Sequence, residues 1–110
     1  MQVQAITKNI GMSPQKMREV VRQIQGLHAL QAQALLNAVP RKGARIVAKT
    51  LKSALANAEN NNGLKPESLR IQLAVAGAAT TLKRMIPKAR GSSGPILKRR
   101  CHVKIVLTDE

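Results

Sequence analysis

The hydrophobic residues in the first part of the chain recur at the spacing of α-helices. The first predicted helix begins at Ser13-Pro14, a hydroxyl N-cap followed by proline at a position where its missing N–H costs no hydrogen bond. Its apolar stripe is Met17, Val20, Val21 and Ile24, and Gly26 ends it. A second helix ends before Pro40, because proline disfavours helical geometry at the residue that precedes it. The apolar face predicted for this second helix is Leu30, Ala34, Leu35 and Ala38.

The longest helix is predicted to run from Arg41 to the stop signal Asn62-Gly63. Its apolar stripe contains mainly small side chains, which let another element approach closely: Ala44, Val47, Ala48, Leu51, Ala54, Leu55 and Ala58. A basic row lies beside the stripe, formed by Arg45, Lys49 and Lys52. This row is either a solvated face or a contact with phosphate, and the absence of acids before Glu59 favours phosphate.

The last third of the chain follows the period-two alternation of β-strands. Ile71, Leu73 and Val75 alternate with polar or small residues, which predicts a strand with these three side chains on one face. The final strand has an apolar face of Cys101, Val103, Ile105 and Leu107. Its other face is cationic and carries Arg100, His102 and Lys104.

The segment between these two strands predicts an extended β-hairpin with arms near residues 80–86 and 96–102. Its tip is rich in turn residues: Pro87, Gly91, Gly94 and Pro95. Lys83-Arg84 on one arm and Lys98-Arg99-Arg100 on the other are expected to approach each other, which destabilises a two-stranded ribbon in water. A polyanion around the hairpin would remove that repulsion.

The overall charge points to the same partner. The 110 residues carry 19 Lys and Arg against 5 Asp and Glu, a formal net charge of +14. Nucleic acid is the favoured counterion, and an anionic membrane surface is the second choice. Because the chain has no Phe, Trp or Tyr, it cannot stack bases on aromatic side chains, so recognition of folded RNA by phosphate contacts and shape fits best.

Several other classes are excluded. The single cysteine, Cys101, supports neither a disulfide framework nor a four-ligand zinc site, and no apolar run is long enough to span a membrane. The N-terminal residues lack the apolar core of a secretory signal, which predicts a reduced cytosolic protein. Cys101 and His102 point to opposite strand faces and the acids form no pair, so we expect no enzyme, metal, cofactor or small-molecule substrate. Gly91-Ser92-Ser93-Gly94 lacks the lysine of a phosphate-binding loop.

Three stretches carry a family resemblance: GMSPQKMREVVRQIQG, LKSALANAENNNG and LKRMIPKARGSSGPILKRRCHVKIVLTD. In this order they resemble the first helix, the end of the long helix, and the extended hairpin with its final strand in bacterial large ribosomal subunit protein number twenty-two. The resemblance implies one α+β domain over residues 1–110, with three helices packed on a small antiparallel sheet. A long protruding β-hairpin is expected at about residues 80–102.

The resemblance also implies a function. It predicts a structural protein of a bacterial-type large ribosomal subunit in the cytoplasm, which binds large-subunit rRNA and assists early assembly. The hairpin tip is expected to line the nascent-peptide exit tunnel opposite a loop of large-subunit protein number four, so the nascent peptide is a further partner. The tip residues are Pro87, Lys88, Ala89, Arg90, Gly91, Ser92, Ser93 and Gly94.

The residues expected to contact rRNA come from the first helix, the long helix, the hairpin and the final strand. They are Lys16, Arg18, Arg41, Lys42, Arg45, Lys49, Lys52, Lys83, Arg84, Lys88, Arg90, Lys98, Arg99, Arg100, His102 and Lys104.

Three alternative classes fit less well. A histone-like DNA architectural protein also combines helices with proline-tipped cationic arms, but aromatic residues usually support its dimer core. A cationic membrane-active protein needs a helix with a wide face of large apolar residues, whereas the long helix here offers mainly alanine. An RNA-modifying enzyme needs an acid–base pair or a metal cluster, which the sequence does not contain.

Overall fold

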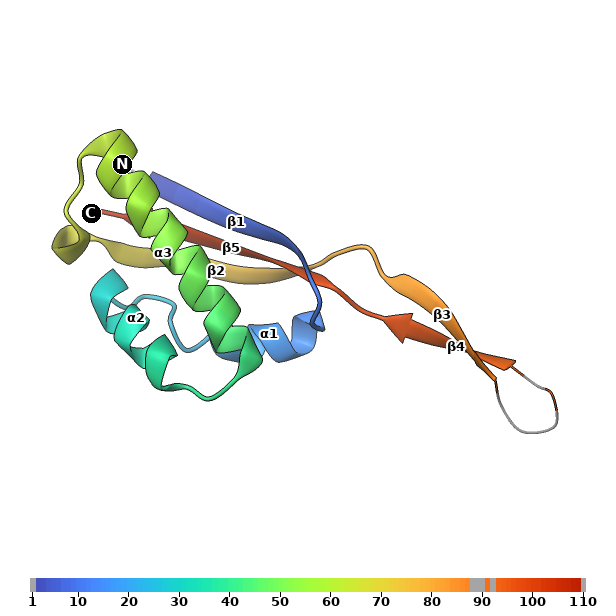
Figure 1. Cartoon of the computed structure of the whole chain (residues 1–110). Coiled ribbons are helices and arrows are strands. Elements are labelled where there is room, and N and C mark those ends of the chain that lie inside the picture. Colours follow the sequence, from blue (N-terminus) through green and yellow to red (C-terminus); the bar gives the residue numbers. More distant parts are fainter. Residues whose placement is uncertain (1, 88–90, 92, 110) are drawn as a thin grey trace.

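The computed structural model describes residues 2–87, 91 and 93–109 (Figure 1). In this part of the chain, three helices pack on a three-stranded sheet, and a two-stranded hairpin protrudes from that body. The elements are β1 (Gln2–Ile10), α1 (Pro14–Val21), α2 (Ala29–Ala38), α3 (Lys42–Asn62), a 3₁₀ turn η1 (Pro66–Ser68), β2 (Arg70–Ala78), β3 (Leu82–Pro87), β4 (Ser93–Lys98) and β5 (Cys101–Thr108). The predicted α+β class is confirmed.

The sheet has the order β1-β5-β2, and both outer strands run antiparallel to β5. The sequence did not predict β1, although Val3 and Ala5 alternate with Gln2 and Gln4 and are buried while the glutamines are exposed. The final strand was predicted correctly. Its apolar face is fully buried, as its members show: Cys101, Val103, Ile105 and Leu107.

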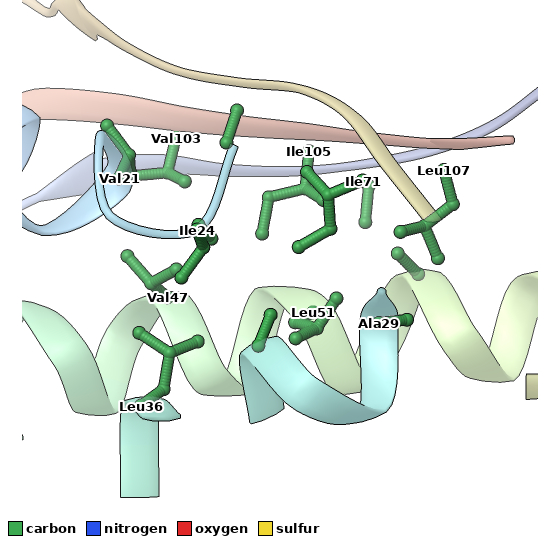
Figure 2. Packing of buried hydrophobic residues seen from close by; sticks show 14 of the residues in the cluster. Val21, Ile24, Ala29, Leu36, Val47, Leu51, Ile71, Val103, Ile105 and Leu107 are labelled. Carbon is green, nitrogen blue, oxygen red and sulfur yellow. The ribbon is translucent and has the colours of Figure 1, made fainter. Parts of the chain in front are cut away.

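The core lies between the sheet and α3 (Figure 2). Val47 and Leu51 point from α3 toward the sheet, where Ile105 and Leu107 point back from β5, and all four are fully buried. Three of the four alanines of the predicted stripe are fully buried as well, Ala44, Ala54 and Ala58, whereas Ala48 is partly buried. Because alanine brings a helix backbone close to its neighbour, this stripe builds a thin body without aromatic residues.

The first helix begins as the sequence predicted. Ser13 is its N-cap, and the Ser13 hydroxyl accepts a hydrogen bond from the Lys16 backbone N–H at 3.4 Å. Regular helix ends at Val21, and the fully buried Ile24 lies in the turn that follows. Gly26 has a φ of 80°, a left-handed conformation that favours glycine.

The second helix buries a different face from the predicted one. Its first turn is fixed because the Ala29 N–H donates to the Leu69 carbonyl at 3.0 Å. The face directed at the core is therefore Ala29, Ala32 and Leu36. Leu30 and Leu35, which were predicted to lie on the apolar face, are 44% and 36% exposed, so the predicted face of this helix was wrong.

A bulge changes the face of β2. Ile71 pairs with Leu107 and Leu73 pairs with Val106, so Gln72 is an extra residue in β2. Ile71 is buried, but beyond the bulge Leu73 and Val75 turn to solvent and are each 39% exposed. Ala74 and Ala76 take the core positions instead. The strand was predicted correctly, whereas the shared face of Ile71, Leu73 and Val75 was not.

The hairpin is present with shifted arms. β3 and β4 pair from Leu82 with Lys98 to Pro87 with Ser93, and they extend the molecule to 62 Å (Figure 1). The return arm therefore begins before the predicted residue 96. Arg99 and Arg100 lie between β4 and β5.

The register corrects the prediction that like charges face each other across the arms. Lys83 pairs with Leu97, Lys98 pairs with Leu82, and Arg84 pairs with Ile96. Each of these cations therefore lies opposite an apolar residue. Because neighbours along a strand point to opposite faces, Lys83 and Lys98 belong to different faces of the ribbon.

Gly63 ends α3 and allows a direct test of this helix terminus. Its φ is 65°, and a Cβ added there would meet no atom within 4 Å. We expect Gly63→Ala to lower the free energy of unfolding by about 1–2 kcal/mol, because alanine resists the left-handed conformation. Urea unfolding measures this loss. Gly77→Ala, at an equally open position without a positive φ, is the control, and an equal loss in both variants would contradict the argument.

Candidate nucleic-acid interface

The basic row of α3 lies on its solvent-facing side. Arg45, Lys49 and Lys52 are exposed, and Lys42 extends the row to the first residue of the helix. Within the part of the chain that the structure describes, none of these four side chains forms an ion pair. An uncompensated row of this length can neutralise a series of backbone phosphates.

A second cationic group surrounds a groove at the base of the hairpin, which we call the root groove. It has a volume of about 500 Å³. The residues that line it come from the loop before α1, from α1 and α3, and from the end of the hairpin: Gly11, Met12, Ser13, Lys16, Lys42, Leu97 and Arg99. The cations of the groove are far apart in the sequence, so the sequence alone could not show that they share it.

Two residues that were predicted to contact rRNA, Arg100 and His102, support the fold at the end of the body from which the hairpin leaves. Asn9 lies where the β1 register shifts, and its φ of 56° is left-handed. The Asn9 N–H donates to His102 Nδ1 at 3.0 Å, and the Arg100 guanidinium donates to the Asn9 carbonyl. Arg100 and His102 thus hold the β1 bulge.

Other predicted contact residues also make internal contacts. Arg18 Nε donates to the Ala76 carbonyl at 3.1 Å and ties α1 to β2. Arg41 Nη1 lies 2.8 Å from Glu19 Oε2, and both side chains are about half exposed. An exposed pair of this kind adds at most about 1 kcal/mol, so its guanidinium remains available to a stronger anion.

Lys104 occupies the centre of the open face of the sheet. It pairs with Ile6 of β1 and Val75 of β2, and both of these apolar side chains are exposed. A groove of about 620 Å³ lies on this face, lined by Gln2, Val3, Gln4, Gln72, Leu73, Lys104 and Val106. The sequence did not predict this groove, because the β2 bulge and the β1 pairing create it.

The hairpin carries the remaining predicted contacts. Lys83, Lys98 and Arg99 are exposed, and Arg84 lies on β3. Of the predicted tip, Pro87 ends β3, Ser93 and Gly94 begin β4, and Gly91 has a φ of 73°. The other predicted tip residues lie outside the described part of the chain: Lys88, Ala89, Arg90 and Ser92.

The described residues contain no cluster of three or more His, Cys, Asp or Glu that could hold a metal ion. Burial raises the pKa of the Cys101 thiol, which keeps this residue protonated at neutral pH. Cys101 therefore packs as a small apolar side chain. Among the helices of the described chain, none is long and apolar enough to cross a membrane.

Comparison with known proteins decides which protein family this fold represents. A family model described as ribosomal protein L22p/L17e matches residues 5–108. The chain belongs to this family. The L22p/L17e assignment confirms the resemblance seen in the three sequence stretches.

Several L22p/L17e relatives cover nearly the whole chain. The large ribosomal subunit protein uL22 of Opitutus terrae is 50% identical over 109 residues, which are 99% of this chain and 96% of the relative. The uL22 of Finegoldia magna is 45% identical over 109 residues (99% and 97%), and that of Akkermansia muciniphila is 44% identical over 110 residues (100% and 98%). The chain is therefore a structural protein of the bacterial-type large ribosomal subunit in the cytoplasm, and it is not an enzyme.

Proposed function

We propose that residues 1–110 act as one domain that binds large-subunit rRNA and assists early subunit assembly, with the hairpin at about residues 80–102 extending into the RNA. The observation that carries this proposal is the distribution of charge along a 62 Å molecule. Cations follow α3, the root groove and the hairpin, and from Ser68 to Thr108 the sequence has no acid. Membership of the L22p/L17e family makes rRNA the polyanion that fits this surface.

The exposed side chains of the hairpin also support the proposal. Met85 is 64% exposed and Leu97 is 49% exposed, so apolar and cationic side chains share the ribbon. A two-stranded ribbon is only marginally stable in water. RNA packed around it would cover the apolar side chains and neutralise the charges, which turns a marginal ribbon into a fixed one.

The position of the hairpin tip supports a second part of the proposal. We propose that residues 87–94 line the nascent-peptide exit tunnel and lie near large-subunit protein number four. The support is the position of Pro87 and Ser93, which close the β3–β4 ladder at the end most distant from the body (Figure 1). Small and turn residues suit a surface that faces a narrow channel.

The α3 row gives the most direct test of rRNA binding. We expect a variant in which Gln replaces Arg45, Lys49 and Lys52 to show a smaller log–log salt slope of rRNA binding. The magnitude of the slope should fall by roughly 2 to 3, because three phosphate contacts are lost. Filter binding at several salt concentrations measures the slope, and circular dichroism checks that helix content is retained.

The matched control replaces Lys8, Arg22 and Lys65 by Gln. These cations are exposed and outside the predicted interface, so the net charge falls equally. An unchanged slope in the α3 variant, or an equal change in the control, would mean that the row is only a solvated face.

A further inference from the structure

The root groove brings together cations that are far apart in the sequence. Lys16 comes from α1, Lys42 from the start of α3, and Arg99 from the segment that leaves β4. Among the described residues that line the groove, none is acidic. Glu19, on the same helix as Lys16, pairs with Arg41 instead.

The groove also joins the N-terminal ends of two helices. Ser13, the N-cap of α1, and Lys42, the first residue of α3, both line it. Neither helix has an acid in its first turn, and α3 has no side-chain cap. The partial positive charge of each helix N-terminus therefore adds to that of the cations.

Close packing holds these ends together. Lys42 Nζ donates to the Gly11 carbonyl at 3.3 Å. A Cβ at Gly43 would lie only 3.2 Å from atoms of both Met12 and Val20, so glycine lets the loop before α1 rest against the first turn of α3. The body side of the groove is thus built in advance.

The other cations of the groove have no internal partner. Within the described part of the chain, the side chains of Lys16 and Arg99 form neither a hydrogen bond nor an ion pair. Like charges gathered in one groove repel each other until an anion enters. Several cations together with a helix N-terminus that has no side-chain cap make an arrangement that proteins use to bind phosphate.

We propose that the root groove binds one backbone phosphate of RNA and that this phosphate joins the hairpin to the body. The proposal rests on the proposed function and adds a defined site to it. Lys16 and Lys42 hold the phosphate from the body, while Arg99 holds it from the hairpin. A bound phosphate therefore fixes the direction in which the hairpin leaves the body.

The first experiment uses inorganic phosphate as the probe and does not need RNA. The full-length protein is titrated at constant ionic strength, and the backbone amide NMR shifts of Lys16, Gly43 and Arg99 are followed. We expect saturable shifts at these three amides. The variant Lys16→Gln/Arg99→Gln should lose them, and Lys42 is kept because it contacts the Gly11 carbonyl.

The matched control is Arg22→Gln/Lys65→Gln, which removes the same charge outside the groove and should saturate like the unchanged protein. Shifts that stay linear, or that change equally in the two double variants, would overturn the proposed site.

The second experiment compares rRNA binding by the same two variants. We expect the groove variant to bind large-subunit rRNA on the order of tenfold more weakly than the control. If both variants bind rRNA equally well, the groove site is wrong while the proposed function stands. If the unchanged protein saturates with phosphate but does not bind rRNA, the proposed function fails and the anion site stands.

Discussion

We expect the affinity of the full-length protein for large-subunit rRNA to fall by about 10⁴- to 10⁵-fold when salt rises from roughly 50 to 200 mM. The cations of α3, the root groove and the hairpin would together make about ten phosphate contacts, and each contact releases counterions. The corresponding log–log slope is about −7 to −9. Filter binding with an rRNA transcript over a series of KCl concentrations measures it.

A slope near about −2 would show that few phosphates are contacted and would contradict the proposed interface. A duplex-bending assay with DNA over the same salt series is the control for the histone-like alternative. Strong bending of DNA, together with weak binding of rRNA, would favour that class instead. We expect neither result, because the body offers shape and charge without the aromatic support that such dimers use.

A second large effect is expected to distinguish the role of the hairpin tip from the role of its arms. A short deletion between Lys88 and Ser93 should leave subunit assembly intact, because the proposed contacts of the arms with rRNA remain. It should instead change the shape of the exit tunnel, which alters the response to macrolides or the stalling of particular nascent peptides. Subunit profiles and a stalling reporter measure the two properties in the same strain.

Replacing Lys83, Arg84 and Lys98 by Gln should have the opposite result, slowing assembly without a specific effect on stalling. Arg100 is kept in this variant because it donates to the Asn9 carbonyl and supports the body. The contrast between the two variants is the test. If the tip deletion blocks assembly while stalling and drug response stay normal, the tip and the arms do not have the separate roles proposed for them.

The sequence predicted those parts of the fold that local pattern controls. The α3 stripe, the Ser13 cap and the apolar face of β5 follow from the spacing of residues and from capping chemistry, and the structure shows them as expected. The face of α2 could not be chosen, because apolar residues occur all round this helix. The hydrogen bond from Ala29 to Leu69 decides it, and this bond joins distant parts of the chain.

Strand pairing explains the remaining differences between the predicted and the observed fold. The bulge at Gln72 and the β3–β4 register depend on which partner each strand finds, and a single sequence does not contain that information. The same holds for the candidate interface. The sequence identified Lys16, Lys42 and Arg99 as cations, but only the packing of the loop before α1 against α3 shows that they share one groove.

The alternation of cations between the two faces of the hairpin has a topological consequence. Lys83 and Lys98 point to opposite sides of the ribbon, so a hairpin that uses both must have RNA on both sides. A ribbon enclosed in this way cannot slide sideways into a finished particle, and it has to be threaded lengthwise or be present when the surrounding RNA closes. Order of addition would then be enforced by geometry: protein supplied before the RNA folds enters readily, and protein supplied afterwards enters slowly whatever its affinity.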